Sequence, residues 1–172
     1  MAQTTFSGPV KSLAGFISAG ESNSVTTAVG ATLNVASFAG KQIYYTSTAT
    51  ATFTLPTVNA SSPSDPTDPN QSNNFGATFE FVLSTTVTGS FIVKVNSSND
   101  TVVGTAIIGE GTTSMAVFST ATASDTITLN GTTTGGVGGA NVKATVVGAN
   151  RYKVEVVSGA TGALATPFSA TV

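Results

Sequence analysis

The chain has 172 residues, of which 51 are Ser or Thr, and its formal net charge is −2. Only 8% of the residues are charged, whereas about 25% is usual in a soluble domain. The sequence has no cysteine, histidine or tryptophan, which excludes disulfides, thiolate or histidine metal sites and histidine-based catalytic triads. The six cationic side chains are scattered and no apolar run approaches about 18 residues, so we expect neither nucleic acid nor a membrane as a partner.

The length and composition predict one domain with a substantial core. A chain of about 150 residues buries roughly 70% of its unfolded surface, and 40% of these residues are hydrophobic. Because charge is scarce, copies of the protein repel one another only weakly, which suits a protein that assembles. The N-terminal sequence MAQTTFSGPVKSLAGF lacks a basic segment followed by an apolar one. We therefore expect synthesis in the cytoplasm without a signal peptide.

Residues 1–30 are the least regular part of the chain. They are rich in Ser, Gly, Ala and Thr, and Pro9 and several glycines argue against a helix. We predict an extended N-terminal arm, with a frayed tail as the alternative. Exposed aromatic side chains favour association, so we expect this arm to dock on a neighbouring subunit. Its candidate anchors are Phe6, Val10, Phe16 and Ile17.

Residues 31–172 predict an all-β domain. Ten runs of four to eight residues are rich in Val, Ile, Thr and Phe and are bounded by Gly, Asn, Asp or Ser. No window has convincing helical spacing, and so many short strands predict an antiparallel β-sandwich or a jelly-roll-like barrel. The predicted strands are Thr32–Phe38, Lys41–Thr46, Ala51–Leu55, Thr78–Ser84, Phe91–Val95, Thr101–Ile108, Ser114–Ser119, Thr126–Leu129, Val142–Val147 and Tyr152–Val157.

Four connections stand out by composition. The segment 148–150, Gly-Ala-Asn, predicts a β-hairpin because Gly and Asn tolerate positive φ, and the segment 96–100 predicts a longer turn of the same kind. The segment 132–140 contains GGVGG and predicts a mobile loop. Residues 56–76 carry four of the six prolines without periodicity, which predicts a long surface loop of the sort that is often functional.

No motif in the sequence favours catalysis. Asp65, Asp68 and Asn70 offer oxygen ligands for calcium, but the interleaved prolines make turn formation the better interpretation. Glu80 and Glu155 are expected on the solvent side of their strands, and a paired-carboxylate hydrolase requires the fold to unite two dispersed acids. We therefore predict that the protein is not an enzyme and uses no cofactor and no metal.

Four short motifs occur in an order typical of a known module. They are F-T-L-P at 53–56, F-G-A-T-F-E-F-V-L at 75–83, D-T-I-T-L-N-G at 125–131 and R-Y-K-V-E-V-V-S-G at 151–159. This order resembles a β-rich module of bacteriophage virion proteins, which include tail-fibre segments and head decoration (cement) proteins. The opening T-T-F-S-G-P-V-K-S-x-x-G-F at 4–16 is similar to the start of small capsid-associated proteins of marine tailed phages.

The resemblance implies a structural role on the outer surface of a virion. The family expectation is a homotrimer that decorates the head and bridges neighbouring major capsid proteins, which makes the major capsid protein and further copies of the chain its partners. Two departures are the Pro/Asp/Asn loop at 56–74 and Tyr152, where the family often has Trp.

The sequence is also compatible with other functions. A tail-fibre or adhesin-type module that recognises a host glycan is the main alternative, although the chain has no repeat shaft. Tyr44, Tyr45 and Tyr152 could stack on a sugar, but half-buried strand aromatics are the preferred interpretation. A small enzyme and a pilus-like or surface-layer subunit are less favoured.

Overall fold

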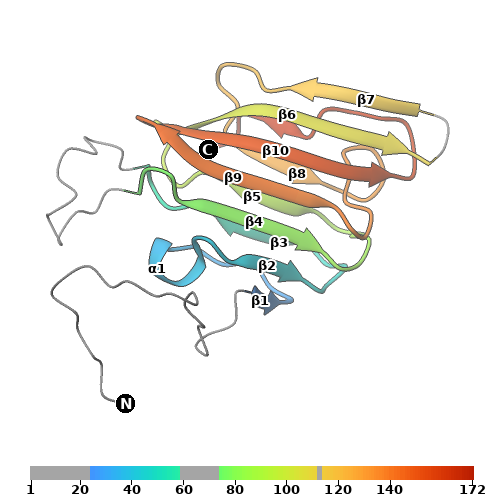
Figure 1. Cartoon of the computed structure of the whole chain (residues 1–172). Coiled ribbons are helices and arrows are strands. Elements are labelled where there is room, and N and C mark those ends of the chain that lie inside the picture. Colours follow the sequence, from blue (N-terminus) through green and yellow to red (C-terminus); the bar gives the residue numbers. More distant parts are fainter. Residues whose placement is uncertain (1–23, 59–73, 112–113) are drawn as a thin grey trace, which may run out of the picture.

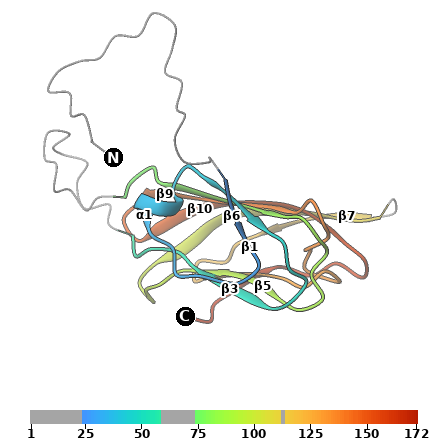
Figure 2. The same ribbon diagram turned by 90° about the horizontal axis from the view of Figure 1, so that it is seen from below.

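The chain folds as two β-sheets packed face to face. The computed structural model describes residues 24–58, 74–111 and 114–172, and Figure 2 shows the two layers edge-on. In spatial order, the larger sheet comprises β1 (Ser24–Thr27), β2 (Gln42–Tyr45), β4 (Thr78–Leu83), β9 (Asn141–Gly148), β10 (Arg151–Ala160), β6 (Thr101–Glu110) and β7 (Ser114–Ser119) (Figure 1). The smaller sheet comprises β11 (Phe168–Ser169), β8 (Thr126–Leu129), β5 (Phe91–Lys94) and β3 (Ala51–Thr54). The predicted all-β sandwich is confirmed.

The strand directions are mixed, which corrects the expectation of an antiparallel arrangement. The chain alternates between the sheets from β2 to β5, so β2 lies beside β4 and β3 beside β5, each pair parallel. The pairs β1–β2 and β6–β10 are also parallel, whereas the other five pairs are antiparallel. Between two parallel neighbours, the chain passes through a strand of the other sheet and then returns in its original direction. The alternation of apolar and polar residues in the sequence does not reveal this crossing.

Four aromatic rings fill the space inside this alternating segment. Tyr45, Phe53, Phe81 and Phe91 come from β2, β3, β4 and β5, one from each, and all are fully buried. Their ring centroids lie 5.2 to 6.0 Å apart in tilted or edge-on arrangements, which aromatic quadrupoles favour. The Tyr45 hydroxyl donates a 2.7 Å hydrogen bond to the Ala49 carbonyl, so its polar atom is paired. These rings join the two sheets.

Nine of the ten predicted strands are present, and the first is wrong. The segment 32–38 forms only an isolated bridge from Thr32 to Thr54, followed by the one-turn helix α1 (Val35–Phe38). Asn34 caps this turn, because its side chain accepts a 2.8 Å hydrogen bond from the Ser37 N–H. The alternation of Leu33 and Val35 therefore indicated a strand where a capped turn forms. The strands β1 and β11 were not predicted.

Of the two predicted hairpins, one is present and the other is not. The hairpin at 148–150 is confirmed: it joins antiparallel β9 and β10, and Asn150 has a φ of 56°. The hairpin predicted at 96–100 is wrong, because this segment joins β5 of the smaller sheet to β6 of the larger one. Two apolar strands need not pair merely because a short polar turn connects them.

The glycine-rich segment 132–140 is held in place rather than free, which corrects the predicted mobile loop. The Asn130 Oδ1 accepts hydrogen bonds from three successive N–H groups at 132–134. The Gly136 N–H donates to Ser158 Oγ at 2.7 Å, and the Gly136 carbonyl accepts from the Val87 N–H at 3.0 Å. Gly136 has a φ of 107° and is buried, so glycine serves close packing here.

Parts of the predicted arm and long loop lie outside the described residues. The anchors Phe6, Val10, Phe16 and Ile17 are among residues 1–23, which the structure does not describe. The end of the predicted arm, Ser24–Thr27, is β1 and pairs with β2. The segment 59–73 of the predicted surface loop also lies outside the described residues.

Candidate interaction surface

The outer face of β10, β6 and β7 exposes a row of apolar side chains. Strand register places Val157 beside Ile107 and Ile107 beside Val117, and these side chains are 58%, 41% and 61% exposed. We call these three residues the apolar row. Met115, 73% exposed, and Val103, 41% exposed, extend it along the same face, and we call the five residues the apolar patch. Contiguous exposed apolar side chains of this kind mark contact surfaces.

The patch arises where two apolar residues follow each other in a strand. Alternation places one of each pair in the core and the other outside: Val102, Ile108 and Val156 are buried, whereas Val103, Ile107 and Val157 are exposed. These doublets are the sequence signal that indicates exposed apolar positions on these strands. The sequence reasoning missed all five residues of the apolar patch.

Two glycines lie beside the row, and only one of them is open to solvent. Gly159 of β10 pairs with Gly109 of β6, and Gly109 pairs with Met115 of β7. A Cβ atom at Gly109 would meet nothing within 4 Å, whereas one at Gly159 would come within 3.3 Å of the Val137 side chain. An exposed apolar strand face suits contact with another folded protein surface better than it suits a small molecule, which needs a concave site.

The outer face of the larger sheet is polar where β10 pairs with β9, and we call this part its polar half. Glu155 of β10 forms a 2.7 Å ion pair with Lys153, and strand register places Lys143 of β9 beside Glu155. The hydrogen bond and charge of Lys153 hold the pKa of the Glu155 carboxyl below its ordinary value, with a smaller contribution from Lys143. Next to them, the Asn141 side chain donates a 2.7 Å hydrogen bond to Glu80 Oε1. The predicted solvent positions of Glu80 and Glu155 are thus confirmed, and the charges bound the apolar row on one side.

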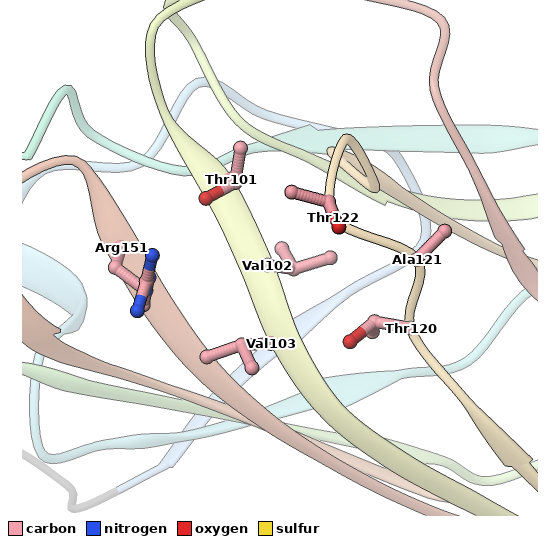
Figure 3. Close-up of a pocket in the computed structure, with 7 residues that line it drawn as sticks. All are labelled: Thr101, Val102, Val103, Thr120, Ala121, Thr122 and Arg151. Carbon is pink, nitrogen blue, oxygen red and sulfur yellow. The ribbon is translucent and has the colours of Figure 1, made fainter.

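A shallow depression of about 250 Å³ lies at the other end of the patch (Figure 3). The strand β6, the Arg151 end of β10 and the segment after β7 surround it. Its lining residues are Thr101, Val102, Val103, Thr120, Ala121, Thr122 and Arg151. Threonine hydroxyls and one guanidinium can bind a carboxylate or hydroxyl group, and Val103 connects the depression with the patch.

Buried acids in the described part have structural roles. Asp125 accepts hydrogen bonds from the Thr171 and Val172 N–H groups at 2.8 and 3.1 Å and from the Thr126 hydroxyl at 2.7 Å. Burial raises the pKa of Asp125, but these hydrogen bonds and the charge of Lys94 outweigh it, so the net pKa is below its ordinary value of 3.8. The carboxylate thereby fastens the segment after β11 to β8.

A second buried acid, Asp100, anchors the segment that follows β3. Asp100 is 1% exposed and its Oδ2 accepts a 3.0 Å hydrogen bond from the Val58 N–H, while its Oδ1 has no partner among the described residues. The nearby Tyr152 hydroxyl donates to the Pro56 carbonyl at 2.7 Å. Burial, with the negative charge of Asp100 as a smaller cause, raises the pKa of Tyr152. This tyrosine is therefore a buried hydrogen-bond donor.

The structure does not assemble a tyrosine platform for a sugar. Tyr45 and Tyr152 are fully buried, and Tyr44 is 38% exposed on the opposite side of β2 from Tyr45. The preferred interpretation of strand aromatics is therefore confirmed. The candidate calcium ligands Asp65, Asp68 and Asn70 lie outside the described residues.

Neither a metal cluster nor a membrane helix emerges from residues 24–58, 74–111 and 114–172. Within these ranges no three acidic side chains gather as a metal site would require. The same ranges contain no helix long and apolar enough to cross a membrane. Comparisons with family models, curated proteins and solved structures found no match for the chain.

Proposed function

We propose that the protein is a structural, non-enzymatic virion protein that decorates a phage head from outside and bridges neighbouring major capsid proteins. The observation that carries the proposal is the apolar patch, of which the central row is 41% to 61% exposed. The motif order from 53 to 159 supports the assignment to a virion. The homotrimer is part of the proposal and rests on the family resemblance.

Bridging needs no chemistry beyond binding. A protein that binds two neighbouring subunits of a closed shell, but not the separated subunits, stabilises the shell by mass action. Several weak contacts made by one oligomer also raise one another's effective concentration, so the whole binds far more tightly than any single contact. The low charge of the chain makes such binding depend little on salt.

The binding test uses purified heads of the phage whose genome encodes the protein. We expect genes for head proteins to lie beside its gene. Val157→Lys places a charge in the apolar row, and we expect at least a tenfold loss of co-sedimentation with heads. The matched control Thr128→Lys places the same charge on the outer face of the smaller sheet and should bind as the unmodified protein does. Equal binding of both variants would contradict a role for the patch.

The predicted arm gives a second, independent contact. The anchors Phe6, Val10, Phe16 and Ile17 are proposed to reach the neighbouring subunit. Removal of residues 2–20 is expected to abolish binding to heads while the sandwich remains folded. Wild-type occupancy of heads by the shortened protein would refute the arm contact.

A host glycan is the second candidate ligand, and the depression beside Arg151 favours it. A guanidinium among threonine hydroxyls suits a carboxylated sugar. This function predicts binding to acidic glycans on an array and loss of that binding in Arg151→Ala. It also predicts a few copies of the protein per particle in the tail, whereas head decoration predicts hundreds.

A further inference from the structure

The last strand of the larger sheet, β7, has an unpaired edge in the described part of the chain. It pairs with β6 on one side and is the terminal strand of the sheet order (Figure 1). The end strand β3 of the smaller sheet has a covered edge. Residues 31–33 lie along it, and hydrogen bonds join Leu33 N to Thr54 O and Thr54 N to Ala31 O. One sheet edge is thus covered from within the chain and β7 is not.

The hydrogen-bond pattern shows which groups of β7 point away from the sheet. The Thr120 N–H donates to the Gly104 carbonyl at 3.1 Å, which fixes the phase of the antiparallel ladder between β7 and β6. Bonded and non-bonded pairs alternate along such a ladder. The main-chain N–H and C=O groups of Met115, Val117 and Ser119 therefore point outward. They form a ready template for another strand.

β7 also lacks the features that protect edge strands in monomeric proteins. Its sequence, SMAVFS, has no charge and no proline, and natural proteins use both to block pairing at exposed edges. The two most exposed apolar side chains among the five of the patch, Met115 and Val117, belong to this strand. An open edge with this composition invites pairing with a strand of similar character.

We propose that β7 pairs with β7 of a second copy of the chain, antiparallel, about a two-fold axis at Val117. In this register Val117 faces its own counterpart and Met115 faces Ser119. Their outward groups form about six main-chain hydrogen bonds. Antiparallel pairing keeps opposed side chains on one face, so the apolar rows of the two copies become continuous. On the other face of the paired strands, Ala116 of one copy faces Phe118 of the other, so a small residue lies opposite a large one.

Charge and symmetry favour a second copy as the occupant. The strand carries no charge and the whole chain has a net charge of −2, so two copies meet without like charges opposed across the axis. Two-fold contacts are the commonest closed contacts between identical chains. Such a contact joins two copies and cannot alone close a trimer; in the proposed trimer it links one trimer to the next. The inference does not rest on the proposed function.

The chain offers an unusually clean cross-linking test, because it contains no cysteine. In Val117→Cys, the two thiols face each other with Cα atoms about 5.5 Å apart, within the range for a disulfide of about 4.4–6.8 Å. Mild oxidation should give a dimer band on a non-reducing gel. The control Val157→Cys has nearly the same exposure, 58% against 61%, on the same face but two strands from the edge. It should give only the monomer band on the same gel.

Association in solution provides the second measurement. An interface of one short strand is small, so we expect a dissociation constant on the order of 10 µM and sedimentation equilibrium to show reversible association. Val117→Lys places two like charges at the axis and should weaken association at least tenfold, with the melting temperature unchanged. Val157→Lys should associate as the unmodified chain does. Equal cross-linking of the two cysteine variants, or association insensitive to Val117→Lys, would overturn the proposal.

Discussion

The two outer faces of the sandwich differ in what they expose to solvent. On the smaller sheet, strand register places Thr52, Ile92 and Thr128 in one row, and all three are half-buried. On the larger sheet, the apolar row occupies the corresponding outward positions and is 41% to 61% exposed. Threonine satisfies both requirements of an outer strand position, since its branched side chain suits the pleated surface and its hydroxyl binds water.

The scarcity of charged residues therefore has different consequences on the two faces of the sandwich. On the smaller sheet, Thr52 and Thr128 place hydroxyls on either side of Ile92, and Lys94 follows on the same face, so the surface remains polar. On the β10–β6–β7 face, exposed Val, Ile and Met replace charges, and such exposure is the property of a contact surface. Substitutions in the shared core should act on folding, whereas substitutions on an outer face should act on that face alone.

The largest effect is expected in the shared core. Phe81→Ala removes one of the four packed rings, and loss of a buried aromatic side chain costs about 3–5 kcal/mol of unfolding free energy. The centroid of Phe81 lies 5.2 Å from that of Phe53 and 5.7 Å from that of Phe91, so the loss is felt in both sheets. Urea titration measures it. A loss below about 1 kcal/mol would show that the rings do not join the two sheets.

The second-largest loss of stability is expected from a substitution at the smaller sheet. Asp125→Asn weakens hydrogen bonds to an ionised acceptor, each worth about 1.5–3 kcal/mol, and should lower stability by roughly 1–3 kcal/mol without changing association through β7. Thermal unfolding and sedimentation together check both parts.

The same carboxylate predicts a pH dependence. Because the folded pKa of Asp125 lies below its ordinary value of 3.8, the folded state favours the ionised form. Its contribution is therefore fully present above pH 3.8 and is lost as the pH falls further through the folded pKa. The unmodified protein should lose stability below about pH 4 more steeply than Asp125→Asn. Parallel pH profiles would be the contrary result.

A smaller effect on stability is expected from the apolar row. Ile107→Thr makes the centre of the row resemble the threonine face, and we expect a change in unfolding free energy within about 0.5 kcal/mol. Binding to heads should nevertheless fall. Thr52→Val, the reverse change on the smaller sheet, serves as the control and should leave binding unaltered. A strongly destabilised Ile107→Thr would indicate a role in folding rather than in contact.

The smallest effect should come from the polar half of the larger sheet. Glu155→Gln removes an ion pair whose two side chains are 58% and 50% exposed, and exposed pairs contribute about 0–1 kcal/mol. Stability should change by a few tenths of a kcal/mol at most, and less at high salt. A loss above 1 kcal/mol would mean that the ion pair of Glu155 stabilises the fold.

The sequence predicted strands well and their arrangement poorly. Alternation located β4 and β5 to within a residue, because burial of every second side chain is a local property. The parallel pairing of β2 with β4 depends instead on the chain crossing to the other sheet at β3, which no local pattern records. In the same way, Asn34 as a helix cap outweighed the alternation that surrounds it.

Motifs for catalysis or metal binding do not indicate the candidate site, because its residues are apolar. The doublets at 102–103, 107–108 and 156–157 interrupt alternation, and in a strand with one buried face they require an exposed apolar side chain. Which of them gather depends on the register between β10, β6 and β7. That register follows from the tertiary fold, so the doublets predict exposed apolar residues but not the apolar row.

A reconstruction of the virion would show whether this protein acts by adhesion through its surface. We expect the sandwich on the outer surface of the head, in hundreds of copies, with the β10–β6–β7 face against a capsid subunit. Head density in which that face is fully exposed to solvent, or a particle that lacks the protein on its head, would contradict the account.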